Sequence, residues 1–116
     1  MSTLRANSIQ NTSGVEQYLA KAWVNFNGTG TVAIRAAGNV SSITDNGVGD
    51  YTVNFTSALA DANYSAVITT GDTANLIYGA LAVVASPQTT TAARFQTRNG
   101  ITPLADAAFV NVAIFR

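Results

Sequence analysis

Residues 20–64 alternate apolar and polar side chains with a period of two, and glycine and asparagine interrupt the alternation at short intervals. A period of two is that of a β-strand with one buried face, and the interruptions are typical of turns between antiparallel strands. In the first such segment, Ala22, Val24 and Phe26 occupy one side and Trp23 the other. We therefore expect an all-β chain whose core is built from alternate residues.

The strongest hairpin signal is Asn46-Gly47, which favours a type I′ turn and is extended here by Val48-Gly49. This turn joins a predicted strand over residues 39–45, which follows a break at Gly38, to a return strand over residues 50–56. Tyr51, Val53 and Phe55 are predicted to share one face of the return strand, and Ile43 is predicted to face them across the turn, with Ser41 as a further candidate.

Further strands are predicted over residues 31–36, 63–70, 76–85, 92–98 and 107–115. Seven or eight strands at intervals of roughly 8–12 residues are typical of a sandwich or small barrel. We expect one antiparallel β-sandwich or jelly-roll-like domain over residues 20–116. The aromatic residues available for its core are Trp23, Phe26, Tyr51, Phe55, Tyr64, Phe95, Phe109 and Phe115.

Residues 1–19 precede the strand pattern and form a predicted N-terminal arm. Leu4 and Ile9 are isolated apolar residues in a polar stretch that also contains Arg5, so the arm buries little surface by itself. It is therefore either a disordered terminus or an arm that orders against a neighbouring subunit or a larger particle. Residues 13–16 have capping-box spacing, which allows one or two helical turns, and an extended linker fits equally well.

The 116-residue chain carries few charges, which limits its partners. Only 10% of its residues are charged and the formal net charge is zero. Nucleic acid requires a concentrated basic patch, whereas the six cations here are scattered along the chain. Small proteins with little net charge tend to associate, so we predict an obligate oligomer, which a monomer in sedimentation at micromolar concentrations would contradict.

Histidine and cysteine are both missing from the chain. This excludes disulfides, thiolate metal sites, cysteine nucleophiles and histidine general bases, so no cofactor or metal is expected. No apolar run approaches the ~20 residues needed to span a membrane, and the opening residues lack the apolar core of a signal peptide. We expect no membrane insertion, and synthesis in a cytoplasm.

Three candidate sites each have a plainer structural interpretation. Residues 45–50 place two carboxylates and an amide on one turn, but a calcium loop needs more oxygen ligands at tighter spacing, so a simple hairpin tip is favoured. Trp23 either stacks on a sugar ring or, as we favour, packs against a neighbouring subunit or the arm. Two predicted loops are either recognition sites or ordinary solvated turns. The residues that they contribute are Asp72, Asn75, Tyr78, Arg98 and Asn99.

Several segments resemble a block found in tail-fibre and related small virion proteins of bacteriophages, especially those of marine and freshwater cyanobacterial hosts. The segments that carry the resemblance are residues 21–30, 39–47, 49–55 and 61–64, and the opening residues 2–14 also resemble the start of such proteins. The likeness covers roughly residues 2–70. It implies a β-rich, commonly homotrimeric protein and transfers no catalytic residue.

The resemblance implies a non-enzymatic virion protein, a tail-fibre or knob-type module that attaches through its arm and binds a host surface glycan. The alternative is a trimeric capsid decoration or cement protein, because the block makes up most of this chain rather than the end of a long fibre. The expected partners are two further copies and other virion proteins. A two-carboxylate glycosidase is disfavoured, because the chain has six acidic residues and most lie on predicted turns or linkers.

Overall fold

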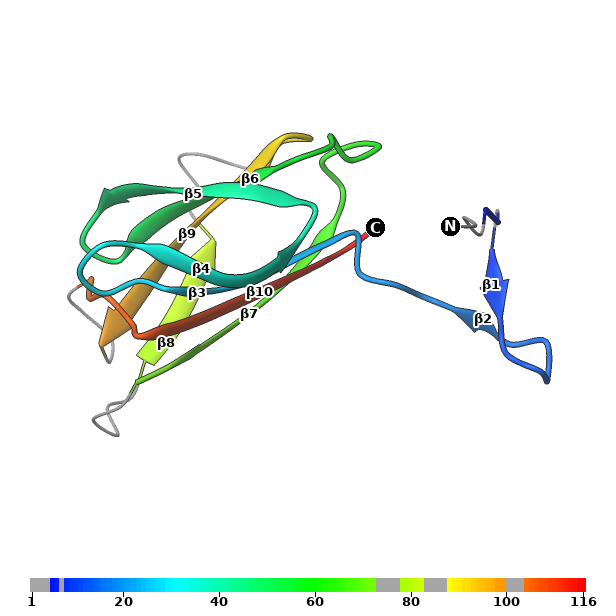
Figure 1. The fold of residues 1–116 in the computed structure, drawn as a ribbon, viewed down its shortest axis with the longest axis horizontal. Helices are drawn as coiled ribbons and strands as arrows, with labels where there is room; N and C mark the ends of the chain where they lie inside the picture. Colours follow the sequence, from blue (N-terminus) through cyan, green and yellow to red (C-terminus); the bar gives the residue numbers. More distant parts are fainter. Residues whose placement is uncertain (1–4, 7, 73–77, 83–87, 100–103) are drawn as a thin grey trace.

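The computed structural model describes residues 5–6, 8–72, 78–82, 88–99 and 104–116, and every regular element among them is a β-strand (Figure 1). The all-β prediction is confirmed. The strands are β1 (Ile9–Gln10), β2 (Glu16–Gln17), β3 (Ala22–Asn27), β4 (Ala33–Gly38), β5 (Val40–Gly47), β6 (Asp50–Phe55), β7 (Ser65–Gly71), β8 (Tyr78–Ala82), β9 (Ala92–Asn99) and β10 (Phe109–Phe115). The described part of the chain contains no helix that could span a membrane.

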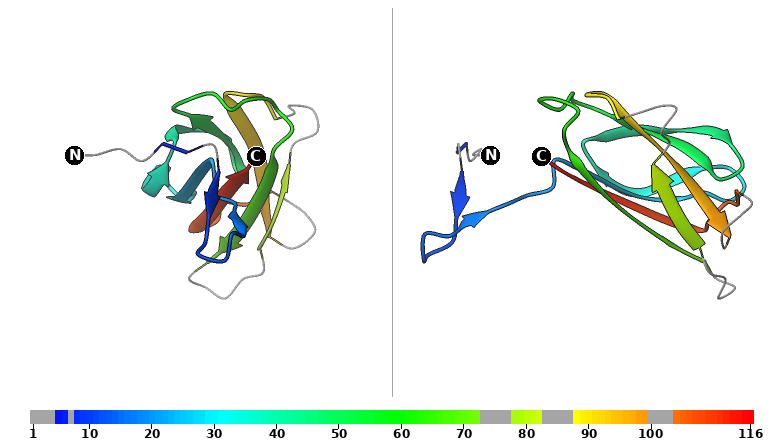
Figure 2. Two further views of the ribbon diagram at one scale, coloured as in Figure 1. Left: turned by 90° about the vertical axis from the view of Figure 1, so that its right-hand side faces the viewer. Right: turned by 180° about the vertical axis from the view of Figure 1, so that it is seen from behind.

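Eight strands form two four-stranded antiparallel sheets, with strand orders β4-β3-β10-β7 and β5-β6-β9-β8. The sheets lie face to face, as the views from the front, end and back show (Figures 1 and 2). The chain changes sheet between β4 and β5, between β6 and β7, between β7 and β8, and between β9 and β10. The predicted antiparallel sandwich is therefore confirmed. β1 and β2 pair only with each other and lie outside it.

The core between the sheets follows the predicted alternation. On β3, Ala22, Val24 and Phe26 are buried, and on β6 the buried apolar residues are Tyr51, Val53 and Phe55. Two edge-to-face aromatic pairs are part of this core. The Phe26 and Tyr51 ring centroids lie 5.2 Å apart across the two sheets, and those of Phe55 and Tyr64 lie 5.9 Å apart. Pairs of this geometry add to the stabilisation that burial alone provides.

Three aromatic residues predicted for the core lie outside it. Trp23, Phe109 and Phe115 are 43%, 38% and 37% exposed. Each occupies the outward phase of its strand, because the opposite phase of β3 and β10 already supplies the core with smaller aliphatic side chains and Phe26. The other five aromatic residues, namely Phe26, Tyr51, Phe55, Tyr64 and Phe95, are buried as predicted.

The β5–β6 hairpin forms where predicted, but its turn lies two residues later. Gly47 pairs with Asp50, so the loop is Val48-Gly49 rather than Asn46-Gly47. A type I′ turn requires two left-handed residues, and in this loop only Gly49 has a left-handed φ, of 62°. The type I′ prediction is therefore wrong.

A β-bulge explains this displacement. The register of β5 against β6 shifts between Asp45 and Gly47, so Asn46 becomes part of the strand. The Asp45 carboxylate accepts a hydrogen bond from the Gly47 N–H at 3.0 Å, and the Asn46 amide donates to the Thr52 hydroxyl at 2.8 Å. These side chains hold the bulge and leave the next two residues to turn.

The corner between β4 and β5 is formed at Asn39 and not, as predicted, at Gly38. Asn39 has a φ of 55°, in the left-handed region that asparagine tolerates better than most residues. Its side chain accepts a hydrogen bond from the Ser57 N–H at 2.8 Å and donates to the Lys21 carbonyl at 3.0 Å. The amide thus fixes the corner against two other segments.

Candidate functional site

The two outer faces of the sandwich differ in chemistry. The outer face of the sheet β4-β3-β10-β7 presents most of the exposed large apolar side chains of the described sandwich strands, and we call it the apolar face. It is defined by Trp23, Val67, Phe109, Ala113 and Phe115. Ile34 on β4 is also exposed, but it pairs with the buried Phe26 and so belongs to the inward phase. The outer face of the sheet β5-β6-β9-β8 is polar in its described residues. Its side chains include Ser42, Thr44, Asn46, Asp50, Thr52, Asn54, Arg94 and Gln96.

Three members of the apolar face form one row across three strands. Trp23 pairs in register with Ala113, which pairs with Val67 on its other side. Val67 is 51% exposed at the edge of the sheet. Ala113, the smallest of the three side chains, lies between the tryptophan and the valine in this row.

Trp23 also explains the glycine at the end of β4. Gly38 is the register partner of Trp23, and a Cβ at Gly38 would clash with the indole Nε1. The indole therefore lies over the glycine and covers the adjacent strand. Trp23 remains 43% exposed on the outer side of the sheet, the side on which we expect contact with a neighbouring subunit.

Arg35 is the only charged residue within the four strands of this sheet. A bulge in the pairing of β3 with β4 directs it to the outer side, where its guanidinium carbon lies 4.3 Å from the centroid of the Phe109 ring. The guanidinium also donates to the Asn25 side chain at 3.1 Å and to the Ala108 carbonyl at 2.7 Å. Its charge is therefore engaged within the same chain.

A polar row continues from Arg35 across the apolar face. The Asn25 amide donates to the Asn111 side-chain oxygen at 2.8 Å, and the Asn111 amide donates to the Thr69 hydroxyl at 3.2 Å. These side chains are hydrogen-bonded to one another across the neighbouring strands β3, β10 and β7. The row can therefore be covered by a partner without leaving its amides unpaired.

The arm is a β-hairpin, not a helix. Asn11 accepts hydrogen bonds from the Ser13 and Val15 N–H groups, and Gly14 adopts a φ of 81°. These contacts make a turn between β1 and β2 at the position where capping-box spacing allowed a helix, so the helical interpretation is wrong. Ser13 does not cap a helix, and its N–H donates to the Asn11 side chain.

The arm exposes apolar side chains and has no core. Of the described residues 5–6 and 8–20, none is buried, and Tyr18 is 80% exposed. The other exposed large apolar residues of the arm are Ile9, Val15 and Leu19. The arm joins the sandwich where the Lys21 N–H donates to the Ile114 carbonyl at 2.7 Å. A lone two-stranded hairpin is marginally stable in water, so this segment is suited to pack against another surface.

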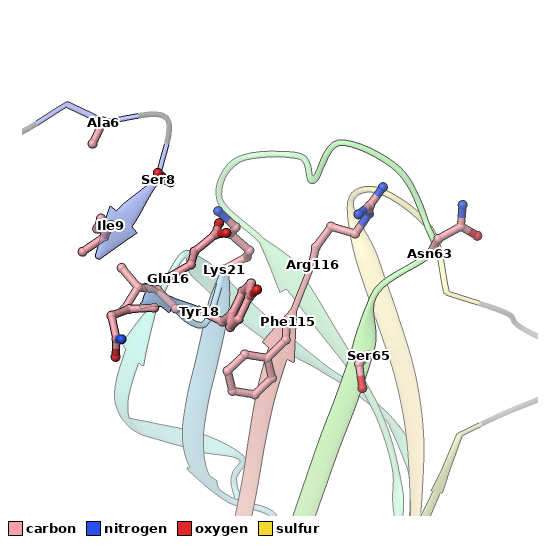
Figure 3. A pocket seen from close by; sticks show the side chains of 12 residues that line it. Ala6, Ser8, Ile9, Glu16, Tyr18, Lys21, Asn63, Ser65, Phe115 and Arg116 are labelled. Atoms are coloured by element: carbon pink, nitrogen blue, oxygen red, sulfur yellow. The ribbon is translucent and has the colours of Figure 1, made fainter. Parts of the chain in front are cut away.

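An open cavity of about 600 Å³ lies between the arm and the end of the sandwich (Figure 3). The arm contributes Ile9, Tyr18 and Leu19 to its walls, and the sandwich contributes Ser65, Phe115 and Arg116. The cavity continues the apolar face at Phe115. Of the predicted attachment residues, Ile9 lines this cavity. Arg5 is exposed and does not line it. Leu4 lies outside the described residues.

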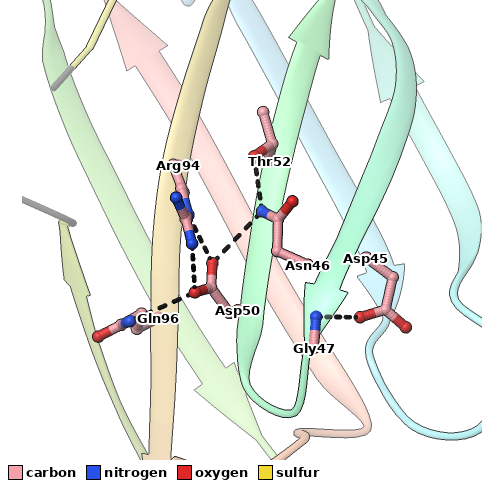
Figure 4. A network of polar contacts seen from close by, with 7 residues as sticks. All are labelled: Asp45, Asn46, Gly47, Asp50, Thr52, Arg94 and Gln96. Carbon is pink, nitrogen blue, oxygen red and sulfur yellow. Dashed lines mark hydrogen bonds and ion pairs between the residues drawn. The ribbon is translucent and has the colours of Figure 1, made fainter. Parts of the chain in front are cut away.

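In the candidate calcium turn, residues 45–50, Asp50 forms an ion pair with Arg94 on the polar face (Figure 4). Arg94 donates to both Asp50 carboxylate oxygens at 2.8 Å, and Asn46 and Gln96 add longer contacts of 3.3 and 3.4 Å. The hydrogen bond from Arg94 lowers the pKa of Asp50 below its ordinary value. The residues that the structure describes contain no group of three acidic side chains that could hold a metal ion.

The predicted loop residues lie at the end of the sandwich away from the arm (Figure 1). Asp72 directly follows β7, Tyr78 begins β8, and Arg98 and Asn99 end β9. The β8–β9 register pairs Tyr78 with Asn99, so the structure brings the backbones of two separately predicted loops together. Asn75 lies outside the described residues.

Sequence reasoning missed the role of Tyr51 beyond the core. Its buried hydroxyl lies 2.8 Å from the Gly28 carbonyl and 2.7 Å from an Asp106 carboxylate oxygen, which also accepts the Gly49 N–H at 2.8 Å. Burial, and then the neighbouring Asp106, raise the pKa of Tyr51. The available signal in the sequence was Asp106, an acidic residue shortly before the apolar strand β10. Its position alone does not show that it binds the Tyr51 hydroxyl.

No family model, no curated protein and no solved structure matches the chain.

Proposed function

We propose that this chain is a non-enzymatic structural protein of a bacteriophage particle, a tail-fibre or knob-type module. The arm attaches it to other virion proteins, and the opposite end of the sandwich recognises a host surface glycan. The observation that carries this proposal is the arm, whose described residues 5–6 and 8–19 include four exposed large apolar side chains and no buried residue. The resemblance of residues 21–30, 39–47, 49–55 and 61–64 supplies the viral setting.

The positions of the arm and the loops support this division of roles. The arm joins the sandwich at Lys21, whereas Asp72, Tyr78 and Arg98 lie at the other end (Figure 1). A module held at one end presents its opposite end to the surroundings. Shallow glycan sites bind weakly one at a time, and a trimer gives them useful avidity.

The arrangement of carboxylates supports a non-enzymatic role. Asp50 pairs with Arg94, Asp61 pairs with Arg116, and Asp106 binds the Tyr51 hydroxyl and the Gly49 N–H. These acids are held by internal partners on separate parts of the sandwich. A two-carboxylate hydrolase needs a facing pair across a substrate groove.

The test compares phage particles that carry the full chain with particles carrying a chain that lacks residues 2–19. We expect mass spectrometry to find the full chain in purified particles and the shortened chain to be absent from them. The control is the free shortened protein, which should keep the circular dichroism spectrum of the sandwich. Absence of the full chain from particles contradicts the proposal, and incorporation of the shortened chain contradicts attachment through the arm.

Cryo-electron microscopy of the same particles then separates the two structural roles. Density for the sandwich at the tail or at a fibre tip supports the attachment module, and substitutions at Asp72 and Arg98 should then reduce binding to host surface glycan. Density at three-fold positions on the head lattice contradicts the tail assignment. It favours the capsid decoration protein, for which the arm would bridge neighbouring capsid subunits.

A further inference from the structure

We propose that β4 of one copy of this chain pairs edge to edge with β7 of the next copy, so that three copies share one continuous sheet. This inference deepens the proposed function and rests on it, because it takes the trimer from that proposal and assigns the contact that builds it. Two different strands meet in such a contact, which is therefore heterologous and either closes into a ring or continues as a filament. The trimer is the closed case.

β4 and β7 are the two edge strands of the sheet β4-β3-β10-β7. Among the described strands, β4 pairs only with β3, and β7 pairs only with β10. A strand with one neighbour presents a row of backbone N–H and C=O groups on its other side, which is a template for another strand. Neither strand contains proline or lysine. The features that discourage pairing are Arg35 and the bulge at its position, and otherwise both edges can accept a strand.

The two edges fit one another in direction and in length. Each neighbouring pair in the sheet is antiparallel, so β4 and β7 run in opposite directions. If the sheet of one copy continues into the sheet of the next, β7 meets β4 as an antiparallel neighbour and the outer faces stay on one side. β4 has six residues and β7 has seven. The contact can thus run along both strands.

Ile34 is an apolar residue that the sandwich leaves uncovered. It occupies the inward phase of β4, because its register partner is the buried Phe26. Phe26 is 1% exposed, whereas Ile34 is 38% exposed, so the core covers β3 but not the edge beyond it. A β7 strand from the next copy would bring its inward residues Ala66 and Ile68, which are only partly buried, beside Ile34. Removing these side chains from water favours the contact.

The charges of the two strands favour β7 over a second β4 as the partner. Arg35 remains a cation, because the groups that hold it, the Asn25 side chain and the Phe109 ring among them, are uncharged. A β4–β4 contact centred on the strand would bring two Arg35 side chains to neighbouring positions of one face, where like charges repel. β7 contains no charged residue. A β7–β7 contact would leave Ile34 exposed, and pairing of like strands gives a two-fold dimer.

Paired cysteines test this contact, because the unchanged chain has none. Three double variants carry Ala36→Cys on β4 and one substitution on β7, which is Ser65→Cys, Val67→Cys or Thr69→Cys. All four positions are exposed and lie on the outer face, and the three β7 positions sample different registers. Within one copy, two strands separate β4 from β7 by about 14 Å, which is too far for a disulfide.

Mild oxidation at micromolar concentrations should link at least one double variant into a covalent trimer on a denaturing gel. Each single-cysteine variant should stay unlinked, since a heterologous contact then contains only one thiol. The matched control is Ala36→Cys with Val48→Cys, because Val48 is 62% exposed on the β5–β6 turn and takes no part in the contact. This control should also stay unlinked.

Ile34→Lys supplies a readout that does not depend on register. Lysine is a residue that natural sheet edges use against pairing, and here it would place a charge where Ile34 is covered. We expect Ile34→Lys to weaken trimer formation in sedimentation velocity by at least about tenfold. Val48→Lys should sediment as the unchanged chain does, and circular dichroism checks that both variants fold.

Four results overturn the inference. They are a monomeric unchanged chain at micromolar concentrations, folded double variants of which none forms a linked trimer, linked dimers from a single-cysteine variant, and linked products that continue beyond three copies. All of these measurements use the free protein. Loss of the chain from phage particles, in contrast, contradicts the proposed function and leaves the β4–β7 contact intact, so the two failures are distinguishable.

Discussion

The hydroxyl of Tyr51 links three segments that are distant in sequence. It stands between the carbonyl of Gly28, after β3, and the carboxylate of Asp106, before β10, while its own residue belongs to β6 in the other sheet. The same carboxylate receives the Gly49 N–H from the β5–β6 turn. One side chain thus fixes the end of the sandwich opposite the arm.

We expect Tyr51→Phe to lower the free energy of unfolding by about 1–2 kcal/mol. The substitution keeps the ring and its contact with Phe26, but it removes the hydroxyl beside the buried Gly28 carbonyl and leaves Asp106 with the Gly49 N–H as its remaining donor among the described residues. Urea denaturation followed by circular dichroism measures the change. Tyr18→Phe is the matched control, because the Tyr18 side chain is 80% exposed, and it should leave the midpoint unaltered. Equal midpoints for both variants would contradict the role assigned to the Tyr51 hydroxyl.

At the scale of the element, the β5–β6 turn depends on one glycine. Gly49 has a φ of 62°, and a Cβ there would lie 2.5 Å from the Thr97 carbonyl oxygen and 2.7 Å from the Ala105 nitrogen. Both are backbone atoms of a neighbouring strand and loop, which cannot swing aside as a side chain can. The turn is therefore held closely under other parts of the chain.

We expect Gly49→Ala to destabilise the sandwich by about 2 kcal/mol or more, since left-handed strain and a backbone clash add together. Gly30→Ala is the control. Gly30 has a similar φ of 59°, but a Cβ there meets no atom within 4 Å, so only the conformational cost of about 1 kcal/mol applies. Thermal unfolding of the two variants measures the difference. A loss in Gly49→Ala no larger than that in Gly30→Ala would show that the turn is not constrained by its neighbours.

The strands could be predicted because alternation is a local property of the sequence. In residues 50–56, for example, the alternation of apolar and polar side chains predicts which residues are buried, and Tyr51, Val53 and Phe55 are buried in the structure. The turn could not be placed, because the bulge at Asn46 depends on Thr52 across the hairpin. The arm was described correctly as poor in core residues, but its hairpin depends on the Asn11 side chain binding the backbone two and four residues later.

At the scale of the molecule, the candidate surface could be predicted only in part. The outward phase of Trp23 was evident from its strand, whereas Phe109 and Phe115 were assigned to the core because the sequence of β10 is apolar in both phases. The order of strands then decides which outward residues become neighbours. Trp23, Ala113 and Val67 come from three strands, and no local pattern brings them into one row.

The pH dependence of unfolding is a property of the whole sandwich. Hydrogen bonds from arginine lower the pKa of Asp50, through Arg94, and that of Asp61 to about 2, chiefly through Arg116. Because both folded pKa values lie below the ordinary 3.8, their stabilisation is present above that value and is lost as the pH falls through each folded pKa, which for Asp61 is about 2. Burial raises the pKa of Tyr51 and Tyr64 above 10.0, so their contribution is present below pH 10 and is lost above it.

We therefore expect urea midpoints to be nearly constant at intermediate pH and to fall on both sides. The double variant Asp50→Asn with Asp61→Asn should be less stable near neutral pH and should show a shallower acid fall, while Tyr51→Phe should show a shallower alkaline fall. Midpoints measured across the whole pH range check both slopes. An acid fall in the double variant as steep as in the unchanged chain would contradict this origin.

Val48 lies at the tip of the β5–β6 turn, 62% exposed, at the end of the sandwich opposite the arm and Arg116. A peptide inserted after Val48 would leave the chain from a hairpin tip that is anchored internally by the Gly49 N–H and the Asp106 carboxylate. The sandwich is then a carrier for epitope display, in which the arm provides immobilisation and the inserted peptide faces away from the support. Oligomers would present the inserted peptide in several copies, which is the arrangement that immunogens and biosensor surfaces require.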